Sequence, residues 1–355
     1  MPSSKPPTDD QPRRCRRTHL EGGKRGANHQ RSGDQRAQSL HNRGQRIAIA
    51  PLMTKPELQP PCSLAVVGLG ALGLPMAINL RTAGYALRVH TRSRGAESDA
   101  ALQQGDARAA AIGCASPTEA ACGCQALVLC VSDDAAVETV LWGEQGAGPV
   151  LAEGSLVIDC STISPATSQA MAQRLAARGV GYLDAPVTGG TEGAKAGTLT
   201  ILCGGASADL ERARPVLDTI GGSIHHFGPV GAGQQVKAVN QVLVAGSYAA
   251  VAEAMALGQH LKLPMDQVVN ALQHGAAGSW ALRHRSSAML ADHYPLGFKL
   301  ALHHKDLGIA LETAQAMGLE LPISAAVRDQ EATLMAQGLG DADVSALRRS
   351  LPPAP

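Results

Sequence analysis

The chain has 355 residues, of which 45% are apolar and 17% charged, and such a composition suits globular domains with a sizeable core. No stretch reaches the roughly 18 consecutive apolar residues of a membrane span, and the eight cysteines include no C-x-x-C pair. We therefore expect a protein of a reducing, cytoplasmic compartment that neither crosses a membrane nor carries a zinc ribbon.

The net charge of +1 combines two segments of opposite sign. Residues 1–46 hold 11 Lys and Arg against 4 Asp and Glu, whereas the remainder holds 20 against 26. The basic segment is polar and lacks hydrophobic periodicity, so we predict a disordered N-terminal extension over residues 1–61. A basic arm, a transit peptide and an over-long start assignment with Met53 as the true start are the alternatives, and the acidic residues argue against a transit peptide. No aromatic residue lies among the basic ones, so nothing supports binding to nucleic acid.

From residue 62 to residue 230, strand-like apolar runs alternate with helix-like stretches. The runs are 64–67, 86–90, 126–131, 156–159, 181–184 and 199–203, and helix-like stretches lie at 73–83, 134–142 and 166–178. This alternation predicts an α/β domain of the Rossmann type, with a mostly parallel sheet and helices on both faces.

The pattern over residues 231–350 is helical throughout. It begins with a helix over about 234–261, which Pro264 ends, and continues at 265–274, 279–291, 299–317 and 322–337. We therefore predict an all-α second domain built on a long interdomain helix. This helix would begin at the domain junction, where ligand clefts usually form.

The first strand is followed at once by a glycine motif and a helix-like stretch. The motif is Gly68-Leu69-Gly70-Ala71-Leu72-Gly73. In this context G-x-G-x-x-G indicates dinucleotide binding, because the glycines allow a tight turn, a close approach to the pyrophosphate and close packing of the helix on the strand. The N–H groups at the start of the helix would point at the phosphates. A simple glycine-rich turn has the same spacing, so the prediction depends on the rest of the chain.

The residues that end the second strand bear on the choice between NAD and NADP. An acidic residue at this place binds the ribose of NAD, whereas an arginine accommodates the 2′-phosphate of NADP. Here the segment contains Thr91, Arg92 and Ser93 and no carboxylate. Arg92 offers a phosphate a planar pair of donors, so we predict that NADP(H) is preferred, with NAD(H) possible. A solvated turn is the alternative interpretation.

Three polar residues share one face near the start of the long helix. Lys237, Asn240 and Gln241 stand at i, i+3 and i+4, a spacing that places side chains together. Out of context, a lysine and two amides at a helix start are typical of a solvated surface.

The His pairs at 225/226 and 303/304 lack the i, i+4 spacing of two ligands on one helix face, and we expect no metal site.

Several further motifs follow in a fixed order along the chain. They are Gly68–Leu80, Asp159–Pro165, Asp184–Gly190, Gly193–Thr200, Gly231–Gln241, Lys305–Leu307 and the closing Gly338–Leu347. On these motifs, from about residue 64 to residue 347, the chain resembles the β-hydroxyacid dehydrogenase family, which includes 3-hydroxyisobutyrate dehydrogenase and tartronate semialdehyde reductase.

The resemblance implies a reaction and its residues. Lys237 matches the family's catalytic lysine, which would donate a proton to the substrate oxygen as hydride reaches carbon, or accept one in the reverse direction. Asn240 and Gln241 would orient that oxygen. The loop that matches the family's site for the substrate carboxylate consists of Thr188, Gly189 and Gly190. Threonine here replaces the family's usual serine, and its added methyl group should favour a small, polar substrate.

The resemblance also implies contacts on the cofactor side of the site. Val131, Ser132 and Thr162 match positions that line the nicotinamide, although Ser132 stands where relatives commonly have proline. Lys305 matches a second lysine near the cofactor.

The predicted function is the NAD(P)-dependent interconversion of a small semialdehyde acid and its 3-hydroxy acid. Gln241 favours the branch that reduces tartronate semialdehyde (2-hydroxy-3-oxopropanoate) to glycerate. The alternatives are 3-hydroxyisobutyrate, succinic semialdehyde or glyoxylate as substrate, and a non-catalytic module that only binds the cofactor. Lys237 argues against an imine reductase, because those relatives usually replace it.

Related enzymes are dimers or tetramers, so we expect a homodimer or homotetramer.

Overall fold

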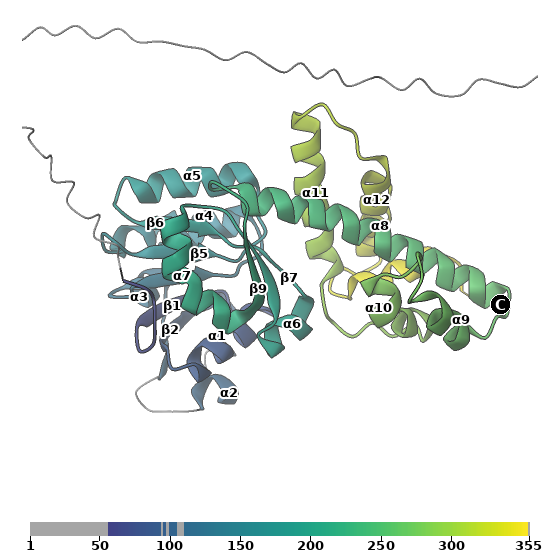
Figure 1. The fold of residues 1–355 in the computed structure, drawn as a ribbon, viewed down its shortest axis with the longest axis horizontal. Helices are drawn as coiled ribbons and strands as arrows, with labels where there is room; N and C mark the ends of the chain where they lie inside the picture. Colours follow the sequence, from purple (N-terminus) through teal and green to yellow (C-terminus); the bar gives the residue numbers. More distant parts are fainter. Residues whose placement is uncertain (1–55, 94, 97–98, 105–109, 354–355) are drawn as a thin grey trace, which may run out of the picture. The chain divides into compact units, whose positions relative to one another are not determined.

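The structure is a computed structural model that describes residues 56–93, 95–96, 99–104 and 110–353 (Figure 1). Most of the predicted N-terminal extension, residues 1–55, lies outside the described residues. Residues 56–61, which the prediction placed in that extension, differ from it because they pack on the first domain. Leu58 is fully buried, and its backbone oxygen accepts a hydrogen bond of 3.0 Å from the Tyr85 hydroxyl. The Leu58 N–H also donates to the Arg212 carbonyl at 2.9 Å, so the segment is attached through its backbone and an apolar side chain.

A six-stranded, all-parallel sheet with strand order β3-β2-β1-β4-β5-β6 forms the first half of the fold (Figure 1). Its strands are β1 (Ser63–Val67), β2 (Ala86–His90), β3 (Ala111–Gly113), β4 (Ala126–Leu129), β5 (Leu156–Asp159) and β6 (Gly181–Asp184). The strand order reverses between β1 and β4, which is where ligands bind in such sheets. The predicted α/β fold class is therefore confirmed.

Helices cover both faces of the sheet. Successive residues of a strand point to opposite sides, and apolar residues here lie on both. Leu64 and Val66 belong to one core cluster, whereas Ala65 and Val67 belong to the other. The covering helices are α1 (Gly73–Thr82), α2 (Ala100–Gln103), α3 (Pro117–Ala121), α4 (Asp134–Trp142), α5 (Pro165–Ala176) and α7 (Ser207–Ile220). Ser164 shows how such a helix begins, because its hydroxyl accepts the Thr167 N–H at the start of α5, with Pro165 in the first turn.

The run 199–203 does not join the parallel sheet, contrary to the sequence-based expectation. It forms β8 (Leu199–Cys203) in a second sheet, between β7 (Val187–Thr188) and β9 (Gly221–His226). The intervening helix α6 (Gly190–Ala196) packs on α1 and on β8 itself. The chain therefore reverses after Thr188, and β8 pairs antiparallel with β7.

The second half of the fold is helical, as predicted. It contains α8 (Ala232–His260), α9 (Met265–Leu272), α10 (Trp280–Leu290), α11 (Leu300–Ala316), α12 (Pro322–Ala336) and the 3-10 helix η4 (Val344–Ser350). Among the described residues, α8 alone is long and apolar enough to cross a membrane by length and composition. It packs against β8, α10, α11, α12 and η4 and supplies Ala245, Tyr248 and Met255 to the helical core. These contacts are those of a central core helix.

Candidate active site

The glycine motif forms the turn between β1 and α1, and its geometry fits a dinucleotide. A Cβ on Gly68 would lie 2.2 Å from the Cys130 backbone oxygen, and one on Gly73 would lie 1.9 Å from the Gly68 oxygen. Gly70 instead faces open space, with no heavy atom within 4 Å of an added Cβ. The start of α1 carries neither a capping side chain nor an acidic residue in its first turn. Its N–H groups therefore suit a pyrophosphate beside Gly70.

The other predicted cofactor residues, apart from Lys305 on α11, lie along the same edge, because each follows the carboxyl end of a parallel strand. Thr91, Arg92 and Ser93 follow β2, Val131 and Ser132 follow β4, and Thr162 follows β5. Hydrogen bonds fix this edge locally. The Ser161 hydroxyl accepts the Val131 N–H at 3.0 Å, and the Ser132 hydroxyl donates to the Asp133 carboxylate at 2.7 Å. Arg92 and Ser93 are exposed, so both are accessible to a ligand.

The beginning of α8 is bound to the sheet by Asp184, the last residue of β6. Its two carboxylate oxygens accept the N–H groups of Gly231 at 2.8 Å and of Gln234 at 3.0 Å. The Gln234 amide donates to the Ser161 carbonyl at 2.8 Å. A Cβ on Gly233 would lie 2.2 Å from the Leu202 oxygen, so only glycine allows α8 to lie this close to β8. Burial raises the pKa of Asp184, while the Gly231 and Gln234 N–H groups oppose that change.

Lys237 lies one turn further along α8 and is buried. Its Nζ donates to the Val187 carbonyl at 2.9 Å and lies 5.9 Å from the centre of the Phe298 ring. Burial lowers the pKa of Lys237 to about 8, with the Asp306 charge raising it and the Lys305 charge lowering it. Both the ammonium and the amine are therefore populated near neutral pH, so this group can donate or accept a proton.

A chain of polar contacts links α8 to the cofactor side of the sheet. The Asn240 amide donates to the Gln241 side-chain oxygen at 2.6 Å, and the Gln241 amide donates to Asp306 at 2.7 Å. Asp306 forms an ion pair of 2.7 Å with Lys305, whose Nζ donates to the backbone oxygen of Thr162. The structure thus brings four predicted residues, Asn240, Gln241, Lys305 and Thr162, into one network through Asp306.

Three further residues shape the site although the sequence did not assign them a role. Asp184 was part of a recognised motif and ends a strand, which could have indicated it. Gln234 and Phe298 carry no such pattern, because their partners lie 73 and 61 residues away in the sequence (Ser161 and Lys237, respectively). Only the packing of α8 on the sheet identifies them.

Within each pair of adjacent histidines, 225/226 and 303/304, the two side chains contact different partners. His225 contacts Ser223 and His226 contacts the Gly205 carbonyl, whereas His303 pairs with Glu331 and His304 contacts the Arg328 carbonyl. Within the described residues, no three His, Cys, Asp or Glu side chains form a group that could hold a metal ion.

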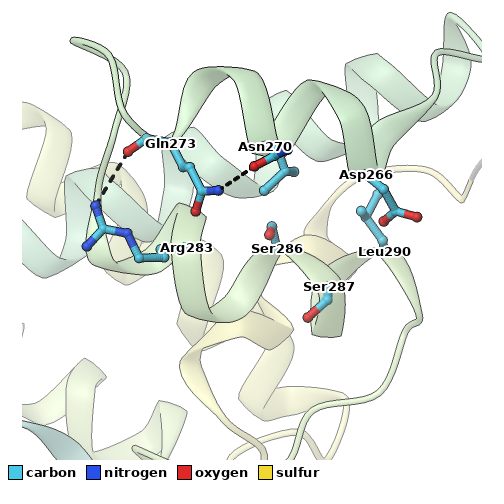
Figure 2. Close-up of a pocket in the computed structure, with 8 residues that line it drawn as sticks. Asp266, Asn270, Gln273, Arg283, Ser286, Ser287 and Leu290 are labelled. Carbon is cyan, nitrogen blue, oxygen red and sulfur yellow. Dashed lines mark hydrogen bonds between the residues drawn. The ribbon is translucent and has the colours of Figure 1, made fainter.

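A cavity of about 240 Å³ lies elsewhere, between α9 and α10 (Figure 2). Its polar side chains partly satisfy one another, since the Gln273 amide donates to Asn270 at 3.0 Å and Arg283 reaches the Gln273 carbonyl at 3.5 Å. None of the predicted site residues lines it. This cavity is therefore separate from the predicted site beside Lys237.

Comparison with known proteins agrees with this architecture. Residues 63–228 match the family model for the NAD binding domain of 6-phosphogluconate dehydrogenase, and residues 231–351 match the model for the NAD-binding region of NADP-dependent 3-hydroxyisobutyrate dehydrogenase.

The matches to individual relatives span nearly the whole length of each relative. The chain is 36% identical to 2-hydroxy-3-oxopropionate reductase of Escherichia coli (strain K12), over 81% of this chain and 96% of the relative. It is also 36% identical to 3-hydroxyisobutyrate dehydrogenase of Pseudomonas aeruginosa, over 75% and 90%. The solved 3-hydroxyisobutyrate dehydrogenase of Mycobacterium tuberculosis superposes with a TM-score of 0.71 at 30% identity, over 82% and 99% of the two chains. The chain therefore belongs to the β-hydroxyacid dehydrogenase family and is an NAD(P)-dependent dehydrogenase that acts on a hydroxyl group.

Proposed function

We propose that this enzyme reduces 2-hydroxy-3-oxopropanoate (tartronate semialdehyde) to glycerate with NADPH. The observation that carries the proposal is the place of Lys237, which is buried between the predicted substrate loop and the Lys305–Thr162 contact on the cofactor side. The likeness to the Escherichia coli reductase supports this substrate. Gln241 supports the same substrate, because glutamine at the end of the Gly231–Gln241 motif resembles the branch that reduces tartronate semialdehyde.

The residues of the chain have distinct tasks in this proposal. When bound, the nicotinamide supplies the hydride in reduction and accepts it in oxidation. The Lys237 ammonium protonates the substrate oxygen as the carbonyl is reduced, and the neutral amine removes that proton in the reverse direction. Asn240 hydrogen-bonds the same oxygen, while Gln241 holds Asn240 and binds Asp306.

The substrate carboxylate is held by Thr188–Gly190, the turn from the end of β7 into α6. The Thr188 hydroxyl and the N–H groups of Gly189 and Gly190 supply its hydrogen bonds. Thr188 directly follows Val187, whose carbonyl binds Lys237. A carboxylate on this loop is therefore close to the proton donor, which suits an acid whose carbonyl lies only one or two carbons from its carboxylate.

The preference for NADP(H) rests on the end of β2. Arg92 and Ser93 are exposed there, and the described part of this turn (residues 91–93) has no carboxylate that would repel a 2′-phosphate. Arginine binds phosphate through two parallel donors. NAD(H) would lack that interaction, so we expect weaker binding of NAD(H).

One experiment tests the substrate and the cofactor together. Consumption of NADPH and of NADH is followed with C2–C4 semialdehydes and 2-oxo acids, including methylmalonate semialdehyde, succinic semialdehyde and glyoxylate. The highest kcat/KM should belong to 2-hydroxy-3-oxopropanoate with NADPH. A preference for methylmalonate semialdehyde would instead favour 3-hydroxyisobutyrate dehydrogenase, the activity named for the Pseudomonas aeruginosa relative. No turnover of any compound would favour a cofactor-binding module.

We also propose that the enzyme is a cytoplasmic homodimer or homotetramer. Large apolar side chains of α8 are exposed, namely Val239, Leu243 and Leu257, and Leu261 follows its end. Exposed apolar surface of this kind is typical of interfaces. Light scattering of the purified protein should give a multiple of the 36.5 kDa chain mass.

A further inference from the structure

We propose that Glu192, Arg285 and Asp343 form a positioning relay that holds the substrate loop against the segment carrying Phe298, and that this relay sets substrate affinity. The inference rests on the proposed function of the loop Thr188–Gly190. None of the three residues contacts the reacting atoms, so they act through the groups that they position.

The first part of the relay is the attachment of the loop to the helical half. Directly after Gly190, the Thr191 N–H donates to the Gly297 carbonyl at 3.2 Å, and its hydroxyl donates to the Leu296 carbonyl at 3.2 Å. Next in the chain, Glu192 forms an ion pair of 2.7 Å with Arg285 of α10. Two consecutive residues therefore tie the substrate loop to the helical half.

The second part is Asp343, which is fully buried in the closing Gly338–Leu347 motif. One carboxylate oxygen accepts the N–H groups of Gly297 and Phe298, each at 2.9 Å. The other lies 3.5 Å from Arg285 Nε and accepts the Ser345 hydroxyl at 2.6 Å. Because a buried carboxylate needs such partners, Asp343 fixes the segment that faces the loop.

Arg285 connects the two parts in a defined geometry. Its side chain is only 9% exposed, and its guanidinium carbon lies 4.6 Å from the centre of the Trp280 ring. A guanidinium held between a carboxylate and an aromatic face loses less conformational entropy on pairing than a free surface arginine. Through Asp343 and Phe298, the loop is thereby coupled to the wall beside Lys237.

The coupling predicts a specific kinetic effect. The loop binds the carboxylate in the ground state and in the transition state alike, so a displaced loop weakens binding without changing the chemical step. Removing the Glu192 carboxylate should therefore raise KM and leave kcat nearly unchanged. Glu192 is half exposed. Its replacement leaves no buried charge without a partner, because Arg285 keeps its ion pair with Asp343.

The test compares E192A with E211A. Glu211 is a matched control, since it is also an exposed glutamate paired with an arginine, Arg214 at 2.9 Å, but lies on α7 away from the loop. We expect E192A to raise KM about fivefold, the equivalent of 1 kcal/mol for a partly exposed pair, with E192Q between E192A and wild type. E211A should leave KM unchanged. An equal KM for E192A and E211A, or an equal loss of kcat and kcat/KM in E192A, would overturn the relay.

Hydrogen exchange provides a second measurement that needs no substrate. E192A should exchange the backbone amides of residues 189–193 faster than wild type, whereas E211A should not. Unchanged protection in E192A would overturn the relay even in an active enzyme. If the wild type reduces no semialdehyde, the proposed function fails, and the exchange measurement alone still decides whether the relay holds the loop.

Discussion

The Asp184 carboxylate at the end of β6 accepts the Gly231 N–H at the start of α8, at 2.8 Å. This contact caps a helix with a side chain from a strand 47 residues earlier. It sets where Lys237, six residues further along the chain, enters the site. The register of α8 on the sheet therefore depends on a residue that takes no part in the chemistry.

The Asp184 cap should contribute to stability and to activity. Asp184→Ala leaves the buried N–H groups of Gly231 and Gln234 without acceptors, which costs about 2–4 kcal/mol of unfolding free energy. Asp184→Asn keeps one acceptor oxygen and should lose less. Urea unfolding followed by circular dichroism measures both. Wild-type stability in Asp184→Ala would show that the cap contributes nothing.

Lys237 should be indispensable for reduction but not for cofactor binding. Lys237→Ala removes the proton donor, so kcat should fall by about 10²–10⁴-fold, while the Kd for NADPH changes little. Lys195→Ala provides the control, because that lysine is exposed on α6. Retention of wild-type kcat in Lys237→Ala would contradict the proposed mechanism.

The two directions of the reaction should depend on pH in opposite ways. Burial lowers the pKa of Lys237 to about 8, so the ammonium required for reduction predominates below pH 8 and the amine required for oxidation predominates above it. The kcat/KM of reduction should fall, and that of oxidation should rise, as the pH increases through about 8. Profiles measured from pH 6 to pH 10 check this. Parallel profiles in the two directions would exclude Lys237 as the titrating group.

Arg92 should determine the cofactor preference. Arg92→Asp replaces a phosphate-binding cation with a repelling carboxylate, so the ratio of kcat/KM for NADPH to that for NADH should fall by about 10–100-fold. Arg283→Asp, an exposed change on α10, should leave the ratio unaltered. An unchanged ratio in Arg92→Asp would place the 2′-phosphate elsewhere.

The buried pair of His303 and Glu331 offers a test of stability. Both side chains are fully buried and lie 2.5 Å apart between α11 and α12. Glu331→Ala leaves His303 Nδ1 without its partner and should cost about 1–3 kcal/mol, whereas the double variant His303→Leu/Glu331→Leu should recover much of that loss. His304→Ala, beside it on α11 but partly exposed, should cost little. Thermal unfolding measures all three, and additive losses in the double variant would argue against a coupled pair.

Much of the fold could be predicted because it depends on local patterns. Strand and helix periodicity indicated the parallel sheet and the helical second half, and the glycine spacing indicated the turn that suits a pyrophosphate. The positions of Lys237, Asn240 and Gln241 on one helix face also follow from spacing alone, because α-helix geometry repeats every 3.6 residues.

The tertiary structure alone decided which distant residues meet. It placed Leu199–Cys203 in a second sheet, Phe298 beside Lys237 and Arg285 against Glu192, which lies 93 residues earlier. Periodicity determines which face of an element is buried but not which element covers it. The sequence by itself therefore determined the glycine turn and the helix face that carries Lys237, whereas the packing of α8, α10 and the closing motif decided which segments contact Thr188–Gly190 and Glu192.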